Sequence, residues 1–146
     1  MNKIYAVPLV KFNEILKYQG YKKNIAYISI QEPVENNIDY FFTAEASNIL
    51  IEKFEDTEDH TNPKSISDYQ AERIINFVSK HKDKDFLIHC TAGISRSGAI
   101  ATYVHTYLNN VSKEYYREWW EFKNDNRNII PNSLIFRKLL NLSSIS

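Results

Sequence analysis

The chain has 146 residues, of which 43% are hydrophobic and 25% charged, as in one ordinary globular domain. Its 18 basic and 18 acidic residues cancel to a net charge of zero, so the bulk charge predicts no general affinity for nucleic acid or membranes. A single cysteine excludes an internal disulfide and a cysteine-rich zinc site. No secretory signal or long apolar run is evident after Met1. We therefore expect one cytoplasmic domain over residues 1–146.

The first half of the chain predicts three strands and one helix. Residues 4–7 form an apolar run that predicts a strand. Residues 10–18 place apolar side chains at helical spacing, and Gly20 is the expected stop of that helix. The β-rich runs 24–30 and 49–54 predict the next two strands.

The segment between the last two strands, residues 34–48, is expected to be irregular. It contains an aromatic cluster of Tyr40, Phe41 and Phe42. Packing in the core is the favoured interpretation of this cluster, and a wall of a substrate pocket is the alternative.

The second half of the chain predicts one strand among several helices. Ser65 or Ser67 is placed to cap a helix with one apolar face. Residues 86–89 form an apolar run typical of a buried parallel strand. Further helices are expected at residues 97–109, 112–124 and 132–141. The alternation predicts an α/β fold with a central, mostly parallel sheet of four to five strands flanked by helices.

The stretch after residues 86–89 carries the chemistry. Cys90 and Arg96 enclose five residues, and Ser97 follows directly. The backbone of residues 91–96 can curl so that its N–H groups form a nest for an oxyanion, next to the positive end of the following helix. The planar guanidinium of Arg96 can clamp two phosphoryl oxygens. Such surroundings favour the thiolate of Cys90, which would then lie behind the phosphorus as a nucleophile.

The string His89-Cys90-x-x-Gly93-x-x-Arg96-Ser97 resembles the signature of the cysteine-based protein tyrosine phosphatase superfamily. The sequence of residues 92–97 is most similar to that of the dual-specificity branch. This resemblance implies a protein-tyrosine-phosphatase-like sandwich that hydrolyses phosphomonoesters through a phosphocysteine intermediate.

The resemblance also implies a role for each residue of the loop. It makes Cys90 the nucleophile and implies that Ser97 assists the departing thiolate. His89 precedes Cys90 and is expected to support the loop by hydrogen bonds. The expected phosphate-binding residues are Thr91, Ala92, Gly93, Ile94, Ser95 and Arg96. The alternative interpretation makes Cys90 and His89 ordinary core residues and Ser97 a helix cap.

A phosphatase also needs an acid that protonates the leaving group, and the polar segment 54–60 offers four carboxylates. By its position in similar phosphatases, Asp56 is the best match. Asp59 is the second candidate, followed by Glu58 and Glu55, and the alternative is that these carboxylates form a solvated acidic turn.

Asn132, which follows Pro131, echoes a Pro-Asn pair of similar phosphatases. It is expected to cap the last helix, and bordering the pocket is the alternative.

The expected substrate is a phosphorylated protein, with phosphotyrosine and also phosphoserine or phosphothreonine as targets, and no metal or cofactor is required. The loop contains no added lysine, which favours a singly phosphorylated protein over a phosphoinositide or an RNA 5′-phosphate. A phosphate-binding module without catalysis is the alternative from another functional class. The sequence predicts no oligomeric state.

Overall fold

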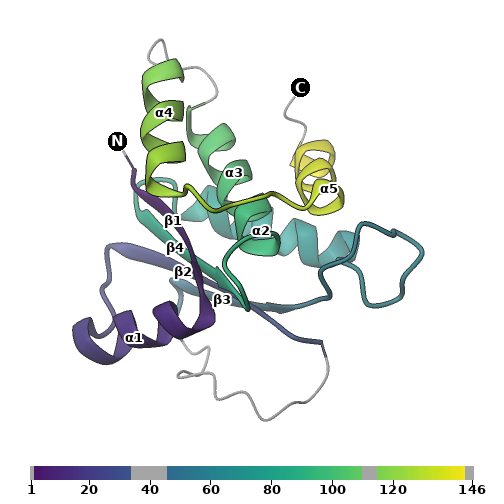
Figure 1. Cartoon of the computed structure of the whole chain (residues 1–146), viewed down its shortest axis with the longest axis horizontal. Helices are drawn as coiled ribbons and strands as arrows, with labels where there is room; N and C mark the ends of the chain where they lie inside the picture. The colour runs from purple at the N-terminus through teal and green to yellow at the C-terminus, as the bar shows by residue number, and fades with distance from the viewer. Residues whose placement is uncertain (1, 34–45, 110–114, 144–146) are drawn as a thin grey trace.

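The computed structural model describes residues 2–33, 46–109 and 115–143. Within these ranges four strands and two helices are interspersed along the chain before three helices end it (Figure 1). The elements are β1 (Ile4–Pro8), α1 (Leu9–Gln19), β2 (Ile25–Gln31), β3 (Ile49–Lys53), α2 (Asp68–Lys80), β4 (Asp85–Cys90), α3 (Arg96–Asn109), α4 (Tyr115–Asp125) and α5 (Ser133–Ser143). The predicted cluster of Tyr40, Phe41 and Phe42 lies outside the described residues.

The sheet has the strand order β1-β4-β2-β3, and every neighbouring pair is parallel. This confirms the predicted α/β fold with its central parallel sheet. Because parallel strands point the same way, their carboxyl ends meet at one edge. In the registers of these pairs, Pro8 lies opposite Cys90, and Gln31 lies opposite Lys53. The end of β4 is thus flanked by β1 on one side and β2 on the other.

The two faces of the sheet belong to two different hydrophobic cores, because side chains alternate along a strand. Ile28 of β2 and Ile88 of β4 join the larger core with residues of α2, α3, α4 and α5. Tyr27 and Leu87, one position earlier, pack with Phe12 of α1. Figure 1 shows α1 on one side of the sheet and the other helices on the opposite side.

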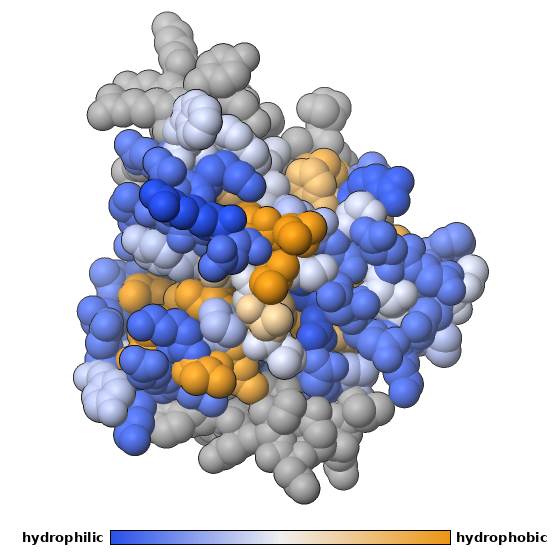
Figure 2. All heavy atoms as spheres, viewed as in Figure 1, coloured by the Kyte–Doolittle hydropathy of each residue, from blue (hydrophilic) through white to orange (hydrophobic). Residues whose placement is uncertain are grey.

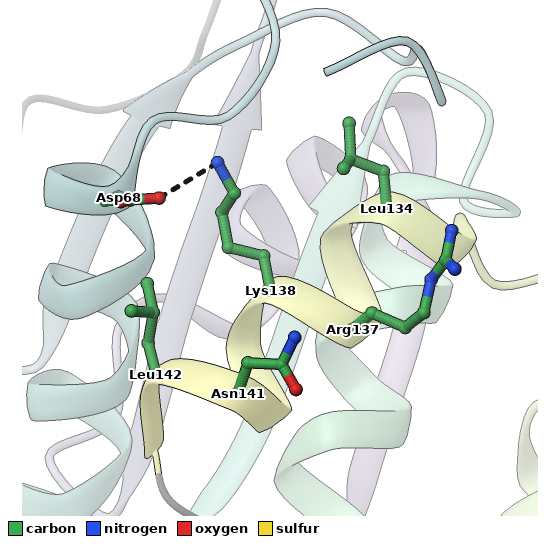
Figure 3. A pocket seen from close by; sticks show the side chains of 6 residues that line it. All are labelled: Asp68, Leu134, Arg137, Lys138, Asn141 and Leu142. Carbon is green, nitrogen blue, oxygen red and sulfur yellow. Dashed lines mark ion pairs between the residues drawn. The ribbon is translucent and has the colours of Figure 1, made fainter.

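Helix α2 starts at a capping box, one of the two caps predicted. The Ser67 side chain accepts a hydrogen bond from the Gln70 amide, and the Gln70 side chain accepts one from the Ser67 amide. Helix α5 packs against α2, and Lys138 Nζ lies 3.0 Å from Asp68 Oδ1 across that contact. Figure 3 shows this ion pair at a surface pocket that residues of α5 line beside α2.

The outer surface in the view of Figure 2 is mostly hydrophilic, with an orange area over the segment from α4 to α5. Ile130, in that segment, is 73% exposed. In the described part of the chain, none of the helices combines the length and the apolar character needed to cross a bilayer.

Candidate active site

The loop between β4 and α3 consists of residues 91–95, because β4 ends at Cys90 and α3 begins at Arg96. Gly93 in this loop has a φ of 71°. A Cβ at Gly93 would lie 2.8 Å from the Pro8 Cδ and closer still to the Pro8 nitrogen. Only glycine accommodates both this conformation and this approach to β1. The loop is therefore curled, as the sequence predicted, and lies against the end of the neighbouring strand.

The loop carbonyls are anchored from outside, whereas the loop amides are not paired. No acceptor for the backbone N–H groups of residues 91–95 is found in the described ranges. The anchoring bonds run from the Leu9 amide to the Thr91 carbonyl (3.2 Å), from the Ile130 amide to the Ile94 carbonyl (3.0 Å) and from the Asn132 amide to the Ser95 carbonyl (3.1 Å). With its carbonyls held outward, the loop offers consecutive amides to an anion.

The sulfur of Cys90 lies at the base of this loop. Cys90 is 2% exposed and belongs to the same core as Ile88, on the side of the sheet that α3 covers. Its Sγ is 3.1 Å from the hydroxyl oxygen of Ser97, in the first turn of α3. The next two residues, Thr91 and Ala92, are exposed. The buried thiol thus comes directly before the loop, next to a hydroxyl group in the first turn of a helix, where the helix has its positive end.

Arg96 is 6% exposed, and its guanidinium is held by three oxygen atoms. Nη1 donates to the Phe54 carbonyl at 3.0 Å, and Nη2 donates to Glu32 Oε1 at 2.6 Å. Nη2 also lies 3.3 Å from Thr91 Oγ1. A guanidinium has five N–H donors, so among the described residues these contacts leave donors, including that of Nε, for the oxygens of a bound anion.

Glu32 is a site residue that our sequence analysis missed. Its Oε1 accepts hydrogen bonds from both Arg96 and the hydroxyl of Thr91, the latter at 2.7 Å. Partial burial raises the pKa of the Glu32 carboxyl, but the hydrogen bonds from Arg96 and Thr91 and the guanidinium charge outweigh this, so that the pKa lies below its ordinary value. The only signal in the sequence is its place at the end of a β-rich run, which becomes meaningful once β2 is known to pair with β4.

His89 is completely buried and supports the backbone at Cys90. Its Nδ1 donates to the Cys90 carbonyl at 3.1 Å, so Nε2 accepts from the Ser29 hydroxyl at 2.6 Å. Burial lowers the pKa of His89 to about 4, against the hydrogen bond to Cys90, and the charge of Arg96 lowers it further. The ring is therefore neutral at physiological pH and lies on the α1 side of the sheet, 4.3 Å from the Phe12 ring.

Of the four carboxylates in residues 54–60, Asp56 contacts the loop. Its Oδ1 accepts hydrogen bonds from the Ser95 hydroxyl at 2.7 Å and from the Asn132 side chain at 2.8 Å. Asp59, by contrast, accepts from Thr61 within its own turn. The other two carboxylates of the segment bind elsewhere, Glu58 to Ser133 and Glu55 to Asn62.

Asn132 caps α5, as the sequence predicted, and also contacts the segment that carries Asp56. Its side-chain oxygen accepts from the Ile135 amide at 3.0 Å and so caps α5. Its Nδ2 donates both to Asp56 and to the Thr57 carbonyl, the latter at 3.1 Å. The start of α5 is thereby tied to the segment that carries Asp56. In the described ranges, no three His, Cys, Asp or Glu side chains gather in an arrangement that could hold a metal ion.

Comparisons with known proteins agree with this geometry. A search of curated proteins found no significant match. Among solved structures, the chain resembles the tyrosine phosphatase OH1 from the Orf virus (TM-score 0.57, 13% identity, covering 100% of this chain and 85% of that one). It also resembles the human tyrosine phosphatase-like serine/threonine/tyrosine-interacting protein (0.55, 20%, 96% and 87%). A third similar structure is PTPMT1 in complex with PI(5)P (0.52, 14%, 97% and 90%).

At these identities the solved structures establish the fold alone. The family follows from the sequence, because the model of the dual specificity phosphatase catalytic domain matches residues 10–144, which is most of the chain. These residues include the whole loop from Cys90 to Arg96 and Asp56, which contacts it. The chain therefore belongs to the dual-specificity phosphatase family, within the cysteine-based phosphatases.

Proposed function

We propose that this protein removes phosphate from phosphotyrosine in proteins, and also from phosphoserine or phosphothreonine, through a phosphocysteine intermediate. One observation carries the proposal: Cys90 comes directly before a loop whose amides have no acceptor in the described ranges, and the loop leads to the buried guanidinium of Arg96. Such donors stabilise the charge of a phosphoryl group in transit, which is the main task of a phosphatase site.

In the first step, the Cys90 thiolate attacks the phosphorus and the bond from phosphorus to the substrate oxygen breaks. Asp56, in its protonated form, gives its proton to the departing oxygen. The alcohol or phenol leaves, and the phosphoryl group stays on sulfur. The hydrogen bonds to Ser95 and Asn132 support Asp56 in this role, because they hold the carboxyl group beside the loop.

In the second step, water attacks the phosphorus of the phosphocysteine, and Asp56 accepts the proton of that water. The bond from sulfur to phosphorus breaks, and inorganic phosphate leaves. The Ser97 hydroxyl, 3.1 Å from the sulfur, donates a hydrogen bond to the thiolate as it re-forms. No cofactor is needed for either step.

The test is turnover of p-nitrophenyl phosphate by the full chain and by Cys90→Ser. The variant should lose turnover while it still binds inorganic phosphate and unfolds at the same denaturant concentration. Residual activity within tenfold of the wild type would refute the nucleophile. Acid-quenched wild-type protein should carry phosphate on Cys90 by mass spectrometry, and Ser97→Ala should increase that fraction because the second step becomes slower.

The substrate class is tested with a panel of phosphotyrosine peptide, phosphothreonine peptide and PI(5)P. PI(5)P belongs in the panel because PTPMT1, a protein of similar fold, was solved in complex with it. We expect the highest kcat/KM for the phosphotyrosine peptide. A higher kcat/KM for PI(5)P would overturn the protein substrate and leave the phosphatase chemistry standing.

A further inference from the structure

A polar cavity lies at the carboxyl ends of β2 and β3, next in sequence to residues that bind Arg96. It has a volume of about 470 Å³, and its lining includes Pro33, Lys53, Lys64, Ser65 and Arg73. Figure 1 shows the segment that leads from β3 to α2 extending outward beyond the end of β3. We call this cavity the Lys53–Lys64 pocket.

The described residues that line the Lys53–Lys64 pocket carry a net positive charge. Of its three cations, Arg73 is paired with the buried carboxylate of Glu52, with 3.0 Å between Nε and Oε1. In the ranges that the structure describes, the ammonium groups of Lys53 and Lys64 form no ion pair. The hydroxyl of Ser65, which also lines the pocket, has no hydrogen-bond partner there either. Two positive charges and one hydroxyl are thus available to an anionic ligand.

Two residues that line the pocket are neighbours in sequence of residues that bind Arg96. Pro33 follows Glu32, which binds Nη2 of Arg96, and Lys53 precedes Phe54, whose carbonyl binds Nη1. Residues that line the pocket are therefore direct neighbours in sequence of the residues that hold the guanidinium.

The separation of the two sites follows from the strand order. Cys90 ends β4 and Lys53 ends β3, with β2 between these strands. Neighbouring strands lie about 4.8 Å apart, so the two strand ends are roughly 10 Å from each other. One residue of an extended peptide spans about 3.3 Å, so a group two to four residues from a phosphorylated side chain at Cys90 reaches the pocket.

We infer that the Lys53–Lys64 pocket binds a second anionic group of a peptide substrate, two to four residues from the phosphorylated side chain that Cys90 attacks. This inference rests on the proposed function and specifies its substrate. The anionic group is either a second phosphate or an acidic side chain, since ammonium and hydroxyl donors accept both. Residues 91–95 of the loop carry no charge, and in this proposal Lys53 and Lys64 supply the positive charge for the second anionic group.

The experiment compares phosphotyrosine peptides that differ only at one position, either three residues before or three residues after the phosphotyrosine. That position is serine, glutamate or phosphoserine. We expect kcat/KM to rise from serine through glutamate to phosphoserine on one side of the phosphotyrosine, by about tenfold in total, since each exposed ion pair contributes a few-fold. The full chain is used throughout, and raised salt should reduce the difference.

The double variant Lys53→Ala/Lys64→Ala should abolish this preference and leave the serine peptide and p-nitrophenyl phosphate unchanged. The matched control is Lys22→Ala/Lys23→Ala, which removes the same charge near the amino end of β2 and should retain the preference. An equal preference in wild type and double variant overturns the inference. A soluble phosphoinositide bisphosphate is assayed as a further substrate. The inference is also overturned if the two lysine substitutions lower kcat/KM for this lipid headgroup alone and not for the doubly anionic peptides.

Failure of the proposed function gives a different result. In that case p-nitrophenyl phosphate is not turned over by any form of the protein. Affinities of the same peptides for Cys90→Ser, with and without the two lysine substitutions, then decide the inference independently. A preference for the doubly anionic peptide that the lysine substitutions remove supports the pocket, and equal affinities refute it.

Discussion

At the scale of single residues, the candidate site depends on how one buried cation is held. The Arg96 guanidinium is nearly inaccessible, and a buried charge requires a partner. Glu32 is that partner, and Thr91 donates to the same carboxylate oxygen. The carboxylate thus fixes both the cation and the first residue of the loop before any substrate binds.

Glu32→Ala should destabilise the free protein by about 1–3 kcal/mol, because it leaves the Arg96 charge without its partner in a partly buried site. Phosphate supplies a replacement anion, so millimolar inorganic phosphate should raise the unfolding midpoint of the variant more than that of the wild type. Urea unfolding with and without phosphate measures both effects. Equal stabilisation of the two proteins by phosphate would contradict this role of Glu32.

Asp56→Asn should lower kcat by about 10²-fold on a phosphotyrosine peptide, since an amide cannot donate the proton that the leaving group needs. The loss should be smaller on p-nitrophenyl phosphate, whose leaving group needs little protonation. Asp59→Asn is the matched control, because among the described residues the Asp59 side chain accepts hydrogen bonds only from Thr61, within its own turn. If Asp59→Asn causes the larger loss, the acid is misassigned.

At the scale of elements, the loop geometry comes from its packing against β1. The amide of Leu9, directly after β1, binds the Thr91 carbonyl, and Gly93 approaches the Pro8 backbone. The segment before α5 holds the other side of the loop through two further amides, those of Ile130 and Asn132. The loop is therefore clamped between two segments that are distant in sequence.

Gly93→Ala should cost clearly more stability than Gly20→Ala. Both glycines have a positive φ, of 71° and 67°, so alanine strains the backbone at either position, and Gly20, with a ψ of −175°, lies in a region that is essentially restricted to glycine. A Cβ at Gly20 meets nothing within 4 Å, whereas at Gly93 it meets the backbone of β1, and we expect this contact to outweigh any difference in backbone strain. Urea unfolding of the two variants compares their free energies of unfolding. Similar free energies of unfolding for the two variants would show that the loop can move away from β1.

At the scale of the whole molecule, the sheet separates the proposed catalytic side chains from His89, which holds the backbone at Cys90 from the other face. Cys90, Ser97 and Arg96 lie on or near the α3 side, and His89 lies among the side chains beneath α1. His89 is neutral when folded, and its ring joins the Ser29 hydroxyl to the Cys90 carbonyl. Protonation of this one ring thus affects the stability of the entire domain.

The pKa of His89 is about 4 in the folded protein and about 6.5 when unfolded, so the unfolded chain binds the proton more tightly. The stability contributed by the neutral ring is complete above about pH 6.5 and is lost as the pH falls toward 4. We expect a loss of about 2 kcal/mol between pH 7.5 and pH 5 in urea unfolding. His89→Gln should remove most of this slope, and substitution of the exposed His60 by glutamine should leave it unchanged.

The elements and the loop chemistry were predictable because both are local. Apolar spacing predicted each strand and helix of the described ranges to within a few residues, and Cys90 and Arg96 belong to one continuous turn. Which of the acidic residues after β3 contacts the loop was not predictable from spacing. The answer depends on Ser95 and Asn132, which come from other parts of the chain.

The sequence by itself determined the strand, the glycine-containing turn and the helix around Cys90, since neighbours along the chain form them. Only the tertiary structure decided what surrounds this turn. The order β4-β2-β3 places Glu32 and the Phe54 carbonyl on Arg96, and Lys53 and Lys64 in the adjoining pocket. The pairing of distant strands depends on burial summed over the whole domain, and no local pattern of residues encodes it.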